Sequence, residues 1–130
     1  MTQLYFDPRS PLLTFPCSIE YKRIGRVWLA LDTGASITII REDALIDIGY
    51  PLASITEFTT FGDPSQTHLV PKVTLNSLSL ADARVENIAV LCYTMPEEYG
   101  IDGVIGLNFL HHFNMNLDFE HGILSLTRFD

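Results

Sequence analysis

Residues 29–36 are Leu29-Ala30-Leu31-Asp32-Thr33-Gly34-Ala35-Ser36, in which an acid directly follows an apolar run and opens a glycine-containing turn. The apolar run predicts a buried strand, and a charge is unusual at the end of such a strand. Gly34 permits a sharp turn and the close approach of another backbone. We expect the hydroxyls of Thr33 and Ser36 to hold the turn through hydrogen bonds to backbone groups. The segment therefore predicts a carboxylate at a rigid turn beside apolar walls, a setting typical of a reactive acid.

The triplet Asp-Thr-Gly occurs once in the chain, and by itself it is common in ordinary loops. The longer pattern is an apolar residue followed by Asp-(Ser/Thr)-Gly-Ala-(Ser/Thr). Average residue usage gives this pattern by chance in about one in several thousand chains of this length, which makes chance a poor explanation. A second acid before a glycine, Asp102, lacks the intervening hydroxyl residue and is interpreted as a structural loop acid.

The composition indicates one folded domain over residues 1–130, because 47% of the residues are hydrophobic and 18% are charged. Sixteen acidic against eight basic residues give a formal net charge of −8. A surface this negative repels phosphate backbones and anionic lipid heads, so we expect neither nucleic acid nor a membrane as a partner. The first residues show no secretory signal and no apolar run is long enough to span a membrane, which favours a cytoplasmic protein.

Short β-type runs separated by turn residues predict a mainly β fold with two short helices. Residues 12–20 and 26–31 are expected to form a hairpin whose second, almost wholly apolar strand is buried on both faces. Residues 55–61 and 66–74 flank Gly62-Asp63-Pro64-Ser65, a turn signal that predicts a projecting hairpin. The other predicted elements are strands over 36–40, 75–80 and 84–93, a polar loop over 94–100, helices over 41–48 and 107–113, and a closing hairpin over 115–119 and 123–128.

The chain resembles the retropepsin-like aspartic proteases, which are single-domain relatives of the retroviral proteases. The resemblance rests on residues 29–36 and on Gly103-Val104-Ile105-Gly106-Leu107-Asn108-Phe109-Leu110, which has the family's two apolar residues and glycine before a short helix. The closing strands look like those of cellular and bacterial members. In addition, the hairpin at 58–68 lies where the family has its flap.

This resemblance covers about residues 12–128 and leaves residues 1–11 as an N-terminal extension. It implies a closed β-barrel or sandwich with a flap hairpin and one or two short helices. It also implies that Asp32 is the catalytic aspartate, that Thr33 hydrogen-bonds across to a partner chain, and that no metal or other cofactor takes part. The other implied site residues bind or cover the substrate or support the turn; they are Gly34, Ala35, Ser36, Phe61, Gly62, Ile105 and Gly106.

A single Asp-Thr-Gly points to a homodimer, because hydrolysis by this chemistry needs two carboxylates that face each other around one water. The predicted activity is therefore that of an aspartic endopeptidase acting on polypeptides, with Asp32 of each chain on a two-fold axis. Apolar pockets for substrate side chains could be lined by Ile37, Ile39, Phe58, Phe61 and Ile105, although core packing is the more ordinary role for Ile37 and Ile39.

Three alternatives differ from this interpretation. The domain could dimerise or bind peptides without cleaving them, or it could be a small β-domain that binds a hydrophobic ligand. Metal-dependent hydrolysis would instead use His111, His112, His121 and Asp118, whose spacing is poor for a shared metal. Cys17 and Cys92 are expected to be buried, reduced thiols, with a bridge between them as the alternative.

Overall fold

The computed structural model of the protein describes residues 1–63 and 65–130, so Pro64 in the predicted flap turn lies outside the described residues. The strands are β1 (Thr2–Tyr5), β2 (Thr14–Glu20), β3 (Ile24–Leu31), β4 (Thr38–Ile40), β5 (Phe58–Asp63), β6 (Gln66–Leu80), β7 (Ala83–Cys92), β8 (Gly103–Ile105), β9 (Phe113–Asp118) and β10 (Ile123–Arg128). The helices are α1 (Glu42–Asp47), α2 (Leu107–Leu110) and the 3₁₀ turns η1 (Leu52–Ser54) and η2 (Glu97–Tyr99).

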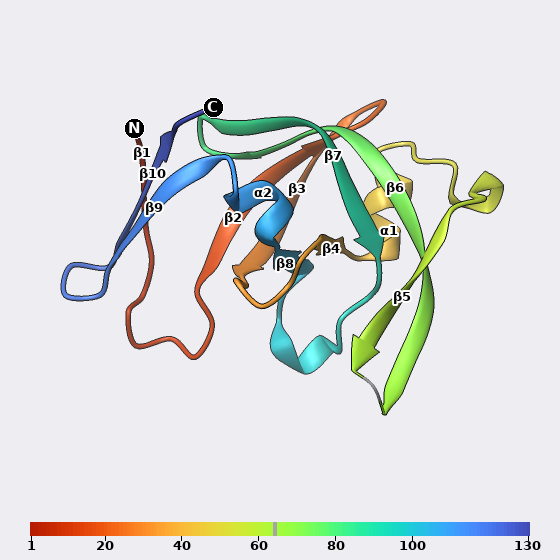
Figure 1. The fold of residues 1–130 in the computed structure, drawn as a ribbon, viewed down its shortest axis with the longest axis horizontal. Coiled ribbons are helices and arrows are strands. Elements are labelled where there is room, and N and C mark those ends of the chain that lie inside the picture. The colour runs from red at the N-terminus through yellow and green to blue at the C-terminus, as the bar shows by residue number, and fades with distance from the viewer. Residues whose placement is uncertain (64) are drawn as a thin grey trace.

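Six strands close into a barrel in the order β2-β3-β8-β4-β7-β6, because β6 also pairs with β2. β3 and β8 are parallel, as are β4 and β7, whereas the other barrel pairs are antiparallel. β5 pairs with the far end of β6 as the flap hairpin, and β1-β10-β9 form a separate three-stranded sheet (Figure 1). The predicted mainly β fold, a closed barrel with a flap hairpin and short helices, is confirmed.

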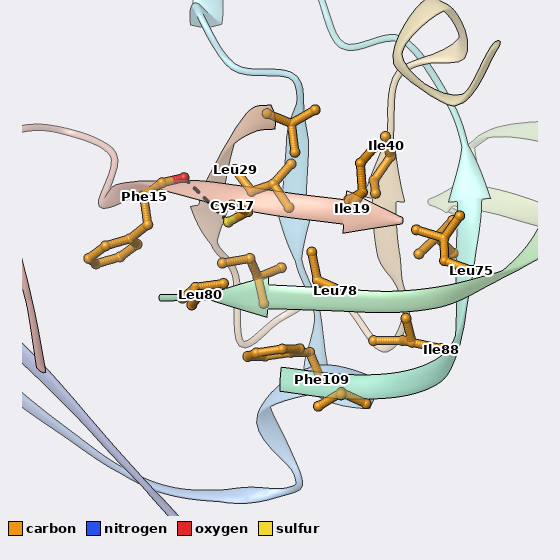
Figure 2. Close-up of a cluster of buried hydrophobic side chains, with 14 of the residues drawn as sticks. Phe15, Cys17, Ile19, Leu29, Ile40, Leu75, Leu78, Leu80, Ile88 and Phe109 are labelled. Carbon is orange, nitrogen blue, oxygen red and sulfur yellow. Dashed lines mark hydrogen bonds between the residues drawn. The ribbon is translucent and has the colours of Figure 1, made fainter. Parts of the chain in front are cut away.

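The barrel interior is filled by alternate side chains of its strands, as period-two alternation predicts. Phe15, Cys17 and Ile19 of β2 point inward, and Phe109 of α2 packs against the same cluster (Figure 2). A second cluster outside the barrel contains Ala30, Ile39, Val70, Leu91, Ile101 and Val104. This outer cluster matters for function because it lies beneath the flap and beside the turn that follows β3.

The prediction that β3 is buried on both faces is wrong at Trp28, which is 53% exposed. The inward residues Val27 and Leu29 belong to the barrel core, whereas outward residues depend on what covers the barrel. Ala30 is covered by the outer cluster, but nothing comparable covers Trp28. An all-apolar run therefore did not guarantee burial on both sides.

The strands predicted over 66–74 and 75–80 form one continuous strand, β6. The side chains that point inward are those of Val73 and Leu75 in the first part of the strand and those of Leu78 and Leu80 in the second. The inward side therefore changes from odd-numbered to even-numbered residues near Asn76. Across the ladder, Asn87 has a φ of 52°, a left-handed conformation that accompanies this irregularity. The phase change made one strand look like two.

Other predicted elements have different boundaries. The strand predicted over 36–40 starts at Thr38, because the preceding residues belong to the turn after β3. The helix predicted over 107–113 ends at Leu110, because Phe113 already pairs with Arg128 in the closing hairpin. The predicted extension over residues 1–11 contains β1, which pairs with β10 along its whole length, so this part belongs to the fold.

The closing hairpin is present as β9 and β10, and its buried face comes mainly from Leu124 and Leu126 of β10. Met115 is 36% exposed on β9, the outer edge of the three-stranded sheet, and Phe119, which lies in the turn after β9, is 54% exposed. The helix predicted over 41–48 is α1, and the chain leaves it through Gly49 with a φ of +92°. No helix within the described residues has the length and apolarity needed to cross a membrane.

Candidate active site

Asp32 lies directly after β3, and backbone hydrogen bonds fix its position. Its N–H donates to the Ile105 carbonyl of β8 at 3.1 Å, which ties the turn to the neighbouring parallel strand. The Gly34 N–H donates to Asp32 Oδ1 at 2.9 Å, and the Ala35 N–H donates to the Asp32 carbonyl at 3.2 Å. The half-buried carboxylate is therefore held by its own turn.

The hydroxyls of Thr33 and Ser36 do not hold this turn, contrary to the prediction, since neither makes a hydrogen bond within residues 1–63 and 65–130. Both side chains are exposed. Gly34 does not use a glycine-only conformation either, because its φ is not positive. A Cβ at Gly34 would meet only Asp32 Oδ1, at 3.2 Å, so its absence keeps space for the carboxylate.

Helix α2 lies beneath the turn and supports it from below. The Leu107 N–H donates to the Ala35 carbonyl at 2.8 Å, and the Asn108 N–H donates to the Ser36 carbonyl at 3.1 Å. A Cβ on Gly106 would lie 2.6 Å from the Ile37 carbonyl carbon, closer than real atoms approach. Gly106 therefore lets α2 start in direct contact with the turn, and close approach rather than an unusual φ requires the glycine.

Two residues of this support were missed by the sequence interpretation: Thr38 and Asn108. Asn108 Oδ1 accepts hydrogen bonds from the Thr38 N–H at 2.9 Å and from the Thr38 hydroxyl at 3.0 Å. The Thr38 hydroxyl oxygen accepts a hydrogen bond from the Gly106 N–H at 3.0 Å, and Asn108 Nδ2 donates one to the Ala89 carbonyl at 2.6 Å. The sequence carried one signal for each residue. Thr38 is a hydroxyl residue inside an apolar run, and Asn108 is an amide directly after Gly106-Leu107.

The flap hairpin brings Phe61 and Gly62 to the same cavity as the predicted turn residues Gly34, Ala35 and Ser36. This cavity is about 360 Å³ and is completed by Ile37, Ile39, Thr59, Thr60 and Leu91. Gly62 has a φ of +124°, and a Cβ there would lie 2.2 Å from the Gln66 carbonyl oxygen. The flap strand therefore requires glycine at this position.

A second cavity of about 350 Å³ contains Asp32 itself. Its other lining residues are almost entirely apolar; they are Leu12, Ala30, Leu31, Met95, Tyr99, Ile101 and Val104. The acid therefore stands between two hollows, one under the flap and one beside η2. Figure 1 shows the turn after β3, η2 and the flap end at the same side of the molecule.

The apolar residues predicted to line pockets divide into two groups. Ile37 and Ile39 line the cavity under the flap and also pack in the outer cluster. Ile105 is fully buried in the barrel core and lines neither cavity beside the turn, so its contribution is the carbonyl that accepts the Asp32 N–H. Phe58 is 49% exposed and also lines neither of them.

A larger hollow, about 870 Å³, lies between α1, η1 and the β6–β7 end of the barrel, away from Asp32. It is lined by Ile46, Tyr50 and Leu69 among others, and it contains none of the residues of the turn after β3. Size alone therefore does not mark the candidate site. What marks it is the acid at a rigid turn between apolar walls.

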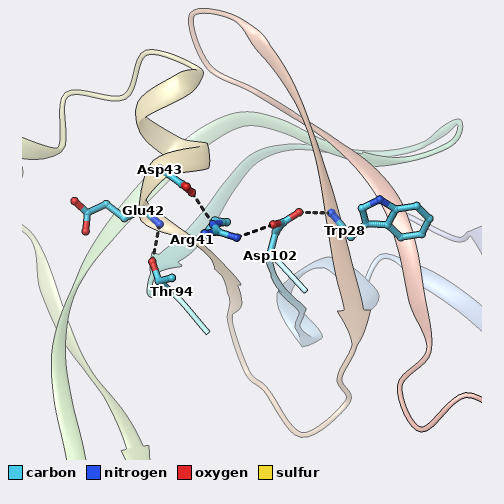
Figure 3. Close-up of polar contacts among 6 residues, drawn as sticks. All are labelled: Trp28, Arg41, Glu42, Asp43, Thr94 and Asp102. Atoms are coloured by element: carbon cyan, nitrogen blue, oxygen red, sulfur yellow. Dashed lines mark hydrogen bonds and ion pairs between the residues drawn. The ribbon is translucent and has the colours of Figure 1, made fainter. Parts of the chain in front are cut away.

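Asp102 is occupied by structural contacts (Figure 3). Its carboxylate accepts the Trp28 N–H at 2.7 Å and pairs with the Arg41 guanidinium at 3.2 Å. Arg41 also contacts Asp43 at 2.6 Å, and the hydrogen bond to Asp102 is the main cause of its raised pKa. Asp102 therefore joins β3, β8 and the start of α1, in agreement with its interpretation as a structural acid.

The histidines proposed for the metal alternative lie in separate contacts. His121 bonds to Asp118 at 2.8 Å, and His112 bonds to Asp130 at the C-terminus. Within the part of the chain that the structure describes, no three His, Cys, Asp or Glu side chains are placed to hold a metal. Cys17 and Cys92 are free and buried, and burial raises the pKa of these thiols to about 12 and about 11.

The sequence model of a family described as aspartyl protease matches residues 17–109. This chain belongs to that family. The matched segment includes the turn at Asp32, the flap hairpin and the glycine before α2. No curated protein matches the chain closely enough to be reported as a relative.

Solved structures share the fold of this member of the aspartyl protease family. The crystal structure of a retropepsin-like aspartic protease from Rickettsia conorii gives a TM-score of 0.74 at 17% identity, over 96% of this chain and 88% of that chain. The retroviral protease-like domain of Ddi1 from Leishmania major gives a TM-score of 0.61 at 18% identity, over 91% and 90% of the two chains. At such identities the likeness concerns the fold.

Proposed function

We propose that this protein is an aspartic endopeptidase that hydrolyses polypeptides with one Asp32 from each of two copies of the chain. The observation that carries the proposal is the placement of Asp32, a carboxylate held at a rigid turn that lines one largely apolar cavity and adjoins a second cavity under a glycine-containing hairpin. Membership of the aspartyl protease family supports the same chemistry.

The need for a second chain follows from the surroundings of Asp32. Among the described residues that line the two cavities, Asp32 is the only acid. Asp102, the other acid before a glycine, is already bound to Arg41 and to the Trp28 N–H. A two-fold axis beside Asp32 would supply the missing carboxylate as a copy of the same residue. The exposed Thr33 would then face the partner and hydrogen-bond across the axis.

The proposed chemistry needs no covalent intermediate. Two carboxylates at close range cannot both ionise comfortably, so the pair shares one proton. The ionised carboxylate takes a proton from a water, which attacks the scissile carbonyl carbon. The protonated carboxyl donates a hydrogen bond to the oxyanion that develops. The backbone bonds around Asp32 hold its carboxylate in place, so little reorganisation is needed during the reaction.

The substrate would lie in an extended conformation between the flap and the floor, where strand-like backbone contacts position it. Cavities of about 360 and 350 Å³ are each large enough for an apolar side chain. The walls of the cavity beside η2 are mostly aliphatic and aromatic, which favours an apolar substrate side chain there, whereas the cavity under the flap mixes apolar residues with Ser36, Thr59 and Thr60. The net charge of −8 favours substrates that are neutral or basic elsewhere.

A complex peptide mixture tests the proposal when it is incubated with the wild type, with Asp32→Asn and with Asp47→Asn. Asp47 is an exposed acid at the end of α1 and lines neither cavity beside Asp32, so its variant is the matched control. We expect cleavage by the wild type and the control, and at least a thousandfold loss in Asp32→Asn.

Cleavage that survives in Asp32→Asn would refute the role of this residue. Absence of cleavage by the wild type, together with dimer formation or peptide binding, would instead support a silent peptide-binding domain. Sedimentation of the active wild type tests the dimer, and an active obligate monomer would refute the shared-acid mechanism.

A further inference from the structure

Three rings meet between the flap and the body of the protein. Phe61 of β5 and His68 of β6 are direct cross-strand partners, and their ring centroids lie 6.5 Å apart. Tyr93, the first residue after β7, lies 4.8 Å from Phe61 and 5.5 Å from His68. The two flap strands therefore contact one ring that belongs to the barrel side.

The outer part of the flap has little other support. The ladder between β6 and β7 ends at the pair Lys72 and Leu91, so among the residues that the structure describes, β5 is the one strand that pairs with residues 66–71 of β6. β5 is itself an edge strand. An isolated two-stranded hairpin is marginally stable in water, so the position of this segment depends on contacts with the body.

The side chains of the hairpin divide sharply in burial. Residues 66–69 are exposed, whereas Val70 is buried in the outer cluster at the base of the hairpin. Phe61 also packs against that cluster, together with Tyr93. Between Val70 and the tip of the flap, the described contacts with the body therefore include the ring contacts that Phe61 and His68 make with Tyr93.

Tyr93 also lies at a boundary between two hollows. It lines the large cavity of about 870 Å³, while Phe61 lines the cavity of about 360 Å³ beside the turn after β3. The contact between these two rings separates the hollows. Because open space lies on one side of Tyr93, its ring can rotate away from Phe61 without displacing the barrel core.

We propose that Phe61, His68 and Tyr93 form an aromatic latch that holds the flap over the cavity beside Asp32, with Tyr93 as the positioning residue. Opening the latch frees the described flap residues, 58–63 and 65–71, to lift and admits an extended polypeptide, and closing it returns Phe61 to the wall of the cavity. Aromatic pairs of this geometry stabilise a contact by a factor of about 2 to 13 each. The two contacts of Tyr93 can therefore decide whether the flap is mainly closed or mainly open.

Hydrogen–deuterium exchange of the full chain tests the latch without requiring catalysis. We expect Tyr93→Leu to accelerate exchange in residues 58–63 and 65–70 about 5- to 20-fold and to leave β2 and β3 at the wild-type rate. Tyr93→Phe keeps the ring and should behave as the wild type. The matched control is Tyr5→Leu, an exposed tyrosine on β1 that makes no flap contact. At the flap, His68→Phe should preserve protection and His68→Ala should lose part of it.

Unchanged exchange at the flap in Tyr93→Leu would refute the latch, and so would an equal acceleration throughout the barrel. A kinetic measurement rests on the proposed function: Tyr93→Leu should raise KM for a long peptide severalfold and change kcat by less than threefold. A fall in kcat with unchanged KM would contradict a positioning role. If the wild type cleaves no peptide, the proposed function fails, while the exchange measurement still decides the latch.

Discussion

Replacing Asn108 with leucine should destabilise the protein strongly, because this amide connects three elements around the candidate site. It accepts two hydrogen bonds from Thr38 on β4 and donates one to the Ala89 carbonyl on β7. Leucine has a similar volume but no polar atoms. The substitution therefore removes the hydrogen bonds without leaving a large cavity.

The expected cost follows from the groups left behind. The Thr38 N–H and the Thr38 hydroxyl would both lose their acceptor, and Thr38 is fully buried. The Ala89 carbonyl would lose a donor, but Ala89 is only half-buried, so this loss costs less. An unsatisfied buried polar group costs about 1–3 kcal/mol, so the two Thr38 groups cost about 2–6 kcal/mol. Additional apolar burial by leucine offsets about 1 kcal/mol. We expect Asn108→Leu to lower the free energy of unfolding by about 1–5 kcal/mol, compared with the 5–15 kcal/mol typical of domains.

Urea unfolding of four proteins measures this effect: the wild type, Asn108→Leu, Thr38→Val and the double variant. Thr38→Val leaves the Gly106 N–H without its acceptor and should cost about 1–2 kcal/mol. Because the two residues share hydrogen bonds, the double variant should lose at least about 1 kcal/mol less than the sum of the single losses. Asn116→Leu, at an exposed position on β9, is the matched control and should change stability by less than about 0.5 kcal/mol.

Two results would refute this reasoning. The first is an Asn108→Leu variant as stable as the Asn116→Leu control. The second is an additive double variant, which would show that the two side chains do not act together. If the proposed peptidase activity is present, Asn108→Leu should also reduce kcat, because α2 donates two backbone hydrogen bonds to the turn after Asp32.

Gly106→Ala should lower the free energy of unfolding by about 1–3 kcal/mol, since its Cβ would meet backbone atoms at 2.6–2.9 Å. Gly34→Ala should cost less than about 1 kcal/mol in the same urea titration; equal losses would contradict the close-approach argument. Cys17 and Cys92 should react with a thiol reagent at pH 8 over 100-fold more slowly in the native state, because burial raises their pKa. The pKa of each thiol is therefore higher in the folded protein than the usual 9.0. The corresponding contribution to the free energy of unfolding is fully present below pH 9.0 and is lost as the pH rises toward 11–12. Rapid labelling of the native protein would contradict both statements.

Local patterns predicted most of the strands and both short helices, because alternation and turn residues report which side of an element is apolar. They failed where tertiary cover decides burial, as at Trp28, and where a strand changes phase, as near Asn76. The turn at Asp32 was located correctly in the chain. The hydrogen bonds that hold the turn were predicted wrongly, because backbone N–H groups make them rather than the hydroxyls of Thr33 and Ser36.

The sequence by itself determined the family and the position of the acid, because a carboxylate held at a tight turn after a buried strand needs a particular local order of residues. The tertiary structure decided what surrounds that acid. Thr38 and Asn108 are 70 residues apart, and they meet because β4 pairs with β8, which leads directly into α2. Phe61 and Tyr93 meet for a similar reason. Contacts of this kind depend on which strands pair, here β4 with β8 and β6 with β5 and β7, and no short stretch of sequence encodes that pairing.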